Sequence, residues 1–285
     1  MSREFDLHMP DSLEDALNVL SDMESTPLAG GTNLLVDVRS QRERPKRVVA
    51  LGRVTGLRGI SFDGEKTVVG ARTTISDLLQ SPEIANSGPS LIEAARVFAG
   101  QMVRNAGTVG GNIACASPAA DLIPPLMSLD AEVTLAGSSG NRTVALADYY
   151  QGYKQDIRRP DELITRISWA QLPRNSVNMF YKLARRKGDA ITVTSVAVTL
   201  SMSNGKCAGA RIALGAVAPC VVRAKEPEQL LEGQILSETL IADAAEQAAA
   251  QCNPIDDVRA SAVYRRHCVQ VLVGRLLLQA WNRLA

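Results

Sequence analysis

The chain has 285 residues, 46% of them apolar, which is enough for a buried core in one large domain or two ordinary ones. Its formal net charge of +1 gives no strong field that would favour nucleic acid or anionic lipid over the whole surface. No apolar run reaches the roughly 18 residues of a membrane span, and the N-terminus carries acids where a signal peptide would be basic and then apolar, so we expect a globular, soluble protein of the cytoplasm.

The start of the chain predicts short helices that alternate with short strands. Pro10-Asp11-Ser12 has the composition of a helix start, and apolar residues follow it at helical spacing. The apolar segment 26–29 leads directly into Gly30-Gly31, which predicts a strand, a tight turn and then a helix over 33–38. A buried strand is expected over 48–51.

The next segment continues in the same way up to a glycine-rich stretch. A strand is expected over 66–71, and Thr74 can cap a short helix after it. Ser90 can cap a second helix, whose apolar face runs to Phe98. The chain then enters its most glycine-rich stretch, 105–112, which we interpret as a loop.

The second half of the chain has a different pattern. Beyond an expected strand at 132–136, the character of the sequence changes near 172–175, where we place a domain boundary. Residues 192–202 alternate like a long strand, Asn204-Gly205 is a strong hairpin signal, and 208–217 supplies the return strand. This pattern predicts an antiparallel sheet.

Two helices are expected at the end of the chain, an alanine-rich one over 237–252 and a long amphipathic one over 260–284. Four arginines are interpreted as marking the polar side of the second helix. They are Arg265, Arg266, Arg275 and Arg283.

Metal and disulfide chemistry within this chain are disfavoured. The two histidines, His8 and His267, lie far apart in sequence and outside any metal-ligand pattern. The five cysteines form no C-x-x-C pair, and most of them are expected to be small buried hydrophobes. They are Cys115, Cys207, Cys220, Cys252 and Cys268. The basic run 39–47 is more typical of a solvated loop than of a polyanion site.

Two glycine pairs suggest a site for an anion. Consecutive glycines at 30–31 and 110–111 let the backbone approach a ligand closely, so that amide hydrogens converge on a group such as pyrophosphate. A single pair is more often only a turn, and the two pairs together leave both interpretations open. Neither G-x-G-x-x-G nor G-x-x-x-x-G-K-[ST] can be written anywhere in the chain, which disfavours a Rossmann domain and a P-loop.

Three longer stretches are far more specific than a glycine pair. They are Leu-Ala-Gly-Gly-Thr-Asn at 28–33, the segment 103–124 with Thr-Val-Gly-Gly-Asn at 108–112, and Phe-Tyr-Lys-Leu-Ala-Arg-Arg-Lys-Gly-Asp at 180–189. These stretches resemble the FAD-binding medium subunit of the molybdenum hydroxylases, a family that includes carbon monoxide dehydrogenase and bacterial xanthine dehydrogenase. The resemblance covers nearly the whole chain.

The resemblance implies an α+β fold of two domains. The first, over 1–174, would be an FAD-binding PCMH-type domain, similar to vanillyl-alcohol oxidase, with subdomains over about 1–55 and 56–174. The second, over 175–285, would be an antiparallel sheet with helices, of the CO dehydrogenase flavoprotein C-terminal type.

The resemblance also implies which residues hold FAD. Two segments would wrap the pyrophosphate and the ribityl chain. They are Pro27, Leu28, Ala29, Gly30, Gly31, Thr32, Asn33 and Leu34, and then Thr108, Val109, Gly110, Gly111 and Asn112. Asp121 would accept hydrogen bonds from FAD hydroxyls, although it could instead cap a following turn. Phe98 matches an aromatic residue beside the adenine, and Ile164 and Lys182 match residues beside the isoalloxazine ring.

Each of these last three residues also has a plain structural interpretation. On spacing alone, Phe98 and Ile164 would be core residues and Lys182 a solvated surface lysine.

Arg185, Arg186 and Asp189 are expected to pair with one another. Cys115 departs from the usual residue of the family and is expected to be an inert buried thiol. The cysteine-bearing insertion of the 4-hydroxybenzoyl-CoA reductase branch is absent, which disfavours that branch.

The resemblance implies electron transfer without an acid, base or nucleophile on this chain. FAD would take electrons from a small [2Fe-2S] subunit, a large molybdopterin-binding subunit would oxidise the substrate, and an external acceptor would receive the electrons. The expected assembly is a dimer of heterotrimers. The substrate class and the acceptor stay open. So do two alternatives: a self-sufficient flavoenzyme of the same fold, and an assembly subunit without flavin.

Overall fold

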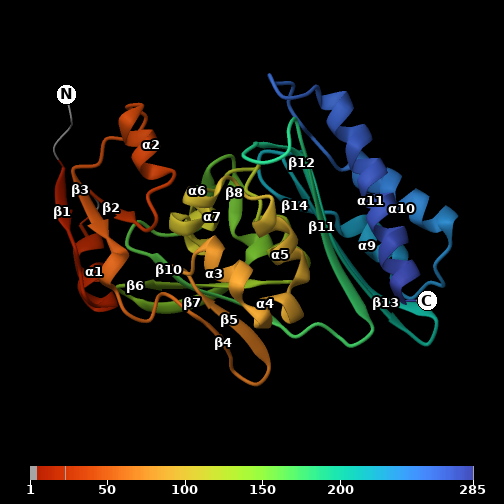
Figure 1. Cartoon of the computed structure of the whole chain (residues 1–285), viewed down its shortest axis with the longest axis horizontal. Helices are drawn as coiled ribbons and strands as arrows, with labels where there is room; N and C mark the ends of the chain where they lie inside the picture. Colours follow the sequence, from red (N-terminus) through yellow and green to blue (C-terminus); the bar gives the residue numbers. More distant parts are fainter. Residues whose placement is uncertain (1–4, 23, 285) are drawn as a thin grey trace.

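Three β-sheets of three to five strands follow one another along the chain and lie in a row along the long axis of the molecule (Figure 1). The computed structural model describes residues 5–22 and 24–284. The N-terminal sheet lies at one end, an antiparallel sheet with short helices occupies the middle, and the C-terminal sheet with its long helices lies at the other end.

The N-terminal sheet is parallel, with the strand order β1-β3-β2. Its elements are β1 (Asp6–His8), α1 (Leu13–Leu20), β2 (Ser25–Leu28), α2 (Leu34–Arg39), β3 (Arg47–Ala50) and the 3-10 turn η1 (Leu51–Arg53). The side chain of Ser12 caps α1 by accepting the N–H of Asp15 at 3.0 Å, and Ala16 and Leu20 bury the helix against β3. The predicted helices and strands of this part are therefore present.

The middle sheet is antiparallel, with the order β4-β5-β10-β6-β7. Its strands are β4 (Ile60–Phe62), β5 (Lys66–Gly70), β6 (Glu132–Gly137), β7 (Gly140–Ala145) and β10 (Leu163–Ala170). Six short helices surround it: α3 (Ile75–Gln80), α4 (Pro82–Ser87), α5 (Pro89–Arg96), α6 (Gln101–Ala106), α7 (Val109–Ala114) and α8 (Ile123–Ser128). The 3-10 turn η2 (Leu146–Asp148) and the pair β8 (Tyr150–Gly152) and β9 (Gln155–Asp156) complete this part.

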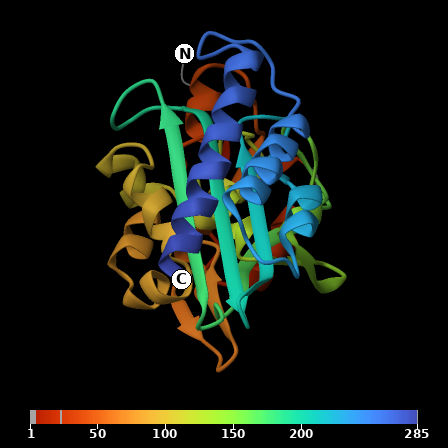
Figure 2. The ribbon, with the colours of Figure 1, turned by 90° about the vertical axis from the view of Figure 1, so that its right-hand side faces the viewer.

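The C-terminal sheet is also antiparallel and is made of β11 (Ser176–Ala184), β12 (Thr192–Ser203), β13 (Lys206–Gly215) and β14 (Val222–Arg223). One face is covered by α9 (Lys225–Leu231), α10 (Glu238–Ala250) and α11 (Ala262–Leu284), with α11 crossing the strands (Figure 2). The hairpin turn has positive φ at both central residues, 51° at Asn204 and 74° at Gly205, as a two-residue turn with the predicted sequence requires.

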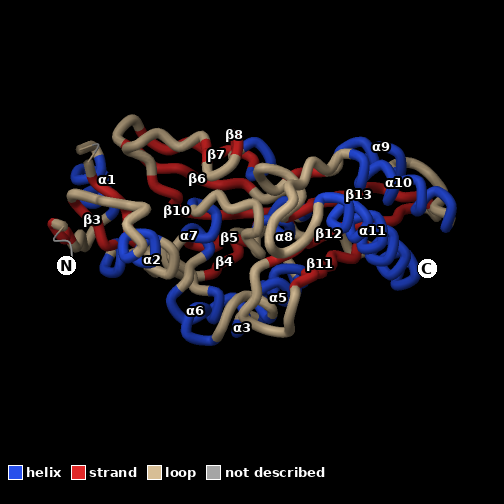
Figure 3. The backbone as a smooth tube through the Cα atoms, turned by 90° about the horizontal axis from the view of Figure 1, so that it is seen from above, coloured by secondary structure: helices blue, strands red, loops and turns tan. Residues whose placement is uncertain are grey.

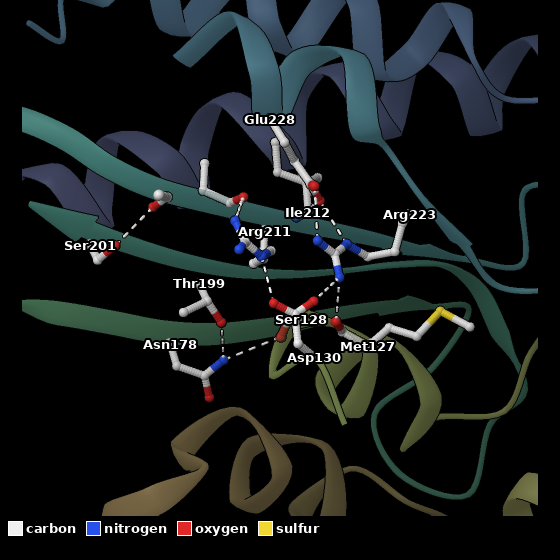
Figure 4. Close-up of polar contacts among 12 residues, drawn as sticks. Met127, Ser128, Asp130, Asn178, Thr199, Ser201, Arg211, Ile212, Arg223 and Glu228 are labelled. Carbon is white, nitrogen blue, oxygen red and sulfur yellow. Dashed lines mark hydrogen bonds and ion pairs between the residues drawn. The ribbon is translucent and has the colours of Figure 1, made fainter. Parts of the chain in front are cut away.

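The other face of the C-terminal sheet meets the middle part through a polar seam (Figure 4). Asp130, just beyond α8, accepts hydrogen bonds from Arg211 of β13, at 2.6 Å, and from Arg223 of β14. The other side of the Arg223 guanidinium donates to Glu228 of α9, at 2.7 and 2.8 Å. Glu228 also accepts the backbone N–H of Ile212 at 2.6 Å, so one chain of contacts joins α8, two strands and α9.

Four sequence-based expectations about local structure are wrong, the last of them only in part. Ser90 is not a cap, because α5 begins at Pro89 after Gly88, and the N–H of Ser90 donates to Asn178 instead. The stretch 105–112 is not a loop but the end of α6, a two-residue turn and the first turn of α7.

The other two errors concern arginines. Arg265 does not mark the polar side of α11, since it is only 2% exposed and donates to the carbonyls of Val193 and Ala216. The expected pairing of Arg185, Arg186 and Asp189 is present only in part: Arg186 donates to the backbone carbonyl of Asp189, at 3.3 and 2.7 Å, whereas Arg185 donates to the carbonyl of Val258.

Within the described residues, no helix combines the length and the apolar character that crossing a membrane requires.

Candidate functional site

A cleft of about 750 Å³ opens where the three parts of the chain meet. Its walls come from the turn after β2, from the α6–α7 segment, from the start of β10 and from the loop 189–191 before β12. Seen from above, α2 lies next to α6 and α7 (Figure 3). This volume is within the range of sites for cofactors and drug-sized ligands.

Most of the residues predicted to hold a ligand line this cleft. They are Pro27, Leu28, Ala29, Gly30, Gly31, Thr32, Asn33, Leu34, Phe98, Thr108, Gly110, Gly111, Asn112, Asp121 and Ile164. The structure does not bring Val109 and Lys182 to the wall. Val109 is 2% exposed and packs into the middle core, and Lys182 lies behind Asp121.

The first glycine segment presents free amides to the cleft. Within residues 5–22 and 24–284, none of the backbone N–H groups from Gly30 to Leu34 donates a hydrogen bond to the protein. Gly31 has φ +70°, which turns the chain from β2 into α2. Consecutive unpaired amides at a turn before a helix form a concave site suited to an anion.

The second glycine segment is different, because the amides of Val109, Gly110, Gly111 and Asn112 already donate to the protein. The N–H groups of Val109 and Gly110 donate to the carbonyls of Thr73 and Ala71, at 3.0 and 2.8 Å. The N–H of Gly111 donates to the side chain of Thr108 at 3.0 Å, which caps α7. The two glycine pairs, which the sequence treats as equivalent, therefore have different roles in the structure.

Close backbone packing explains why two of the glycines are glycine. A Cβ atom on Gly30 would lie 1.8 Å from the carbonyl oxygen of Ala106, and one on Gly110 would lie 2.7 Å from the Cβ of Ala71. These contacts join the N-terminal turn to α6, and α7 to the turn after β5. The glycines thus bring the walls of the cleft together, in addition to any contact with a ligand.

Asp121 sits in a buried polar cluster at the edge of the cleft. It accepts hydrogen bonds from Lys182 Nζ and Thr192 Oγ1, both at 2.6 Å, and it does not cap α8, whose first turn follows Leu122. Burial raises the pKa of Asp121, an effect that Lys182 and Thr192 partly offset. The Lys182 side chain is 4% exposed and also donates to the carbonyl of Val97, so it is no surface lysine.

Phe98 and Ile164 form apolar walls of the cleft, in different neighbourhoods. Lys182 donates to the carbonyl of Val97, and Phe98 is the next residue, so Phe98 lies close to the Asp121 cluster. Ile164 follows Leu163, which packs with Leu51 in the N-terminal core. Both side chains also contact the middle core.

Several lining residues were missed by the sequence analysis. Asp37 accepts a hydrogen bond from Asn33 at 2.8 Å, a contact that the spacing of four residues on a helix could have indicated. Arg72 and Arg158 also line the cleft, but no sequence pattern indicated this position for them. Cys115 lines the cleft, and burial raises the pKa of its thiol, as for an unreactive cysteine.

Two family comparisons cover almost the whole chain. Residues 3–173 match the family described as the FAD binding domain in molybdopterin dehydrogenase, and residues 179–280 match the CO dehydrogenase flavoprotein C-terminal domain. Among curated relatives, the carbon monoxide dehydrogenase medium chain of Hydrogenophaga pseudoflava is 32% identical, over 99% of this chain and 98% of the relative. Subunit alpha of the 6-hydroxypseudooxynicotine dehydrogenase complex of Paenarthrobacter nicotinovorans is 35% identical, over 98% of this chain and 95% of the relative.

Solved structures give the same picture. A chain of carbon monoxide dehydrogenase from Hydrogenophaga pseudoflava superposes with a TM-score of 0.96 at 32% identity, over 100% of both chains. A chain of quinoline 2-oxidoreductase from Pseudomonas putida 86 superposes with a TM-score of 0.92 at 31% identity, over 100% of this chain and 99% of the other.

Proposed function

The chain belongs to the family of FAD-binding medium subunits of the molybdenum hydroxylases, and we propose that it takes electrons from a partner [2Fe-2S] subunit onto FAD and passes them to an external acceptor. Its relatives are subunits of multi-subunit dehydrogenases, in which the other cofactors belong to partner subunits. The α+β fold with an FAD-binding domain and a C-terminal sheet domain, expected from the sequence, is confirmed.

The observation that carries this proposal is the row of free amides from Gly30 to Leu34 along the cleft. Their dipoles suit the pyrophosphate of FAD, and the volume of about 750 Å³ suits a large, elongated cofactor. Bound FAD would supply the ability to accept and release electrons. The residues of the chain would bind and orient it.

The other lining residues support this assignment. Phe98 and Ile164 offer apolar surface that would exclude water from the flat rings of the cofactor. Asp121 faces the cleft with its charge already balanced by Lys182, so it can accept further hydrogen bonds from hydroxyl groups without bringing an unpaired charge. Lys182 would act on the cofactor through Asp121.

The proposed partners follow from the family. We expect a large molybdopterin-binding subunit and a small [2Fe-2S] subunit, assembled as a dimer of heterotrimers in the cytoplasm. The loop 189–191 brings the C-terminal domain to the mouth of the cleft, with Ile191 68% exposed. This loop is a candidate for contact with a partner.

The test is to purify the full chain together with whatever co-purifies, and to record the visible spectrum and the metal content. We expect flavin absorbance from this chain, with iron and molybdenum in the complex. Flavin with turnover in the absence of any partner would support a self-sufficient flavoenzyme instead. A complex without flavin would contradict both functions.

A further inference from the structure

The cleft contains one positive charge without an acidic partner. Six charged residues line it: Asp37, Glu43, Arg72, Asp121, Arg158 and Asp189. Arg158 is held by Asp156 through two hydrogen bonds, at 3.0 and 2.9 Å. Among the residues that the structure describes, Arg72 has no carboxylate within ion-pair distance. A ligand that fills this cleft therefore meets Arg72 as its one uncommitted cation.

The backbone on both sides of Arg72 fixes it beside α7. The carbonyl of Ala71 accepts the N–H of Gly110 at 2.8 Å, and that of Thr73 accepts the N–H of Val109 at 3.0 Å. The N–H of Arg72 itself donates to the carbonyl of Leu57 at 2.6 Å. The turn 71–73 thus binds the amides of Val109 and Gly110, and its central residue, Arg72, lines the cleft beside them.

The environment of the Arg72 guanidinium leaves most of its donors available. Its one hydrogen bond within the described residues is a long contact of 3.4 Å from Nη1 to the carbonyl of Val54. Burial lowers the pKa of Arg72, and the nearby Arg58 adds a charge of the same sign. A guanidinium has five N–H donors and prefers a planar pair of oxygens such as those of a phosphate.

We propose that Arg72 binds the pyrophosphate of FAD from the wall of the cleft that α7 and the turn 71–73 form, while the amides of Gly30 to Leu34 bind it from the N-terminal turn. The inference rests on the proposed function, because it requires that this cleft binds FAD. Pyrophosphate is the only anionic group of FAD, so it is the part of the cofactor that an unpaired cation selects. Arg72 would supply hydrogen-bond donors on the side of the second glycine pair, because the amides of that pair already donate to the protein.

The experiment compares Arg72→Met and Arg72→Lys with the unchanged full chain. Each protein is freed of flavin and titrated with FAD, with ADP, with adenosine and with riboflavin, and the dissociation constants are measured at low and high salt. Arg53→Met is the matched control, because Arg53 is exposed, lies next to Val54 and does not line the cleft.

For Arg72→Met we expect FAD and ADP to bind about tenfold to hundredfold more weakly, as for the loss of a hydrogen-bonded charge pair. Riboflavin, which lacks phosphate, should bind as before. High salt should reduce the difference in FAD and ADP affinity between Arg72→Met and the unchanged chain. Arg72→Lys should bind FAD more tightly than Arg72→Met, and Arg53→Met should bind it as the unchanged chain does.

Two outcomes would overturn the assignment while leaving the proposed function intact. One is FAD affinity unchanged in Arg72→Met. The other is a loss of affinity for adenosine as large as the loss for FAD, which would mean that Arg72 contacts the adenosine part of the cofactor and not the phosphates. If the unchanged chain binds neither FAD nor ADP, the proposed function itself fails.

Discussion

At the scale of single residues, glycine serves two purposes in this chain. Gly31 has the positive φ of the turn before α2, while Gly30 and Gly110 allow two backbones to touch. The sequence predicted both glycine pairs as elements of one site. It could not separate their roles, because the partners Ala71 and Ala106 are small residues without any motif of their own.

Gly30→Ala tests the packing role. The added Cβ would meet the carbonyl oxygen of Ala106 at 1.8 Å, so we expect destabilisation of about 3 kcal/mol, together with loss of FAD. Urea denaturation followed by circular dichroism measures the first, and the flavin content of the purified protein the second. Gly52→Ala is the control, since no atom lies within 4 Å of its added Cβ. Equal stability of the two variants would refute the packing role.

Asp121→Asn tests the buried ion pair. The substitution leaves Lys182, whose side chain is 4% exposed, without its counter-charge, and we expect a loss of about 3–5 kcal/mol in the free energy of unfolding. The double variant Asp121→Asn, Lys182→Met should recover most of this loss. A double-mutant cycle by urea denaturation gives the coupling. If the double variant is as unstable as the sum of the single ones, the two residues do not act as a pair.

At the scale of secondary structure, the sequence predicted the existence of most elements and missed some of their ends. Ser12 and Thr74 cap helices as their positions suggested. Ser90 does not, because Pro89 already fits the first helical position after Gly88. Arg265 was misassigned because its partners, the carbonyls of Val193 on β12 and of Ala216 just beyond β13, lie far away in sequence.

The start of β10 gives an element-scale prediction about pH. Two hydrogen bonds from Arg142 of β7, at 2.7 and 2.8 Å, lower the pKa of Glu162 to about 2, with a further contribution from Arg159. Because the pKa is lower in the folded state than in the unfolded state, this contribution to stability is complete above the ordinary glutamate value and is lost as the pH falls toward 2.

Glu162→Gln should therefore be less stable than the unchanged protein at pH 7, and the difference should shrink between about pH 5 and pH 2. Thermal unfolding across this range measures it. Glu65→Gln, an exposed glutamate without an ion pair among the described residues, should show no such trend. A difference between Glu162→Gln and the unchanged protein that does not vary with pH would contradict the role of the charge.

At the scale of the whole molecule, the order of the parts was predictable and their contacts were not. The hairpin signal at Asn204-Gly205 and the change of pattern near 172–175 indicated a separate antiparallel sheet, and that sheet is present. The seam in Figure 4 depends on pairs such as Asp130 with Arg223, whose separation along the chain leaves no local pattern.

Arg223→Met should weaken that seam severely. It leaves Glu228, whose side chain is 9% exposed, without its charged partner, so we expect a loss of about 3–5 kcal/mol by urea denaturation. Arg211→Met removes a second charged partner of Asp130. Because the side chain of Arg211 is 37% exposed, the expected loss in the free energy of unfolding is only about 0–1 kcal/mol. Similar losses in the two variants would mean that burial at the seam does not govern its strength.

The position of the loop 189–191 has a consequence for biosynthesis. This loop forms part of the cleft wall, and the carbonyl of Val193, two residues later, is held by Arg265 of the last helix. A nascent chain that still has α11 inside the ribosome therefore has the glycine turns of the cleft but not its anchored rim. We therefore expect FAD to bind only after translation is complete, and a chain shortened before α11 to be purified without flavin although every glycine motif is intact.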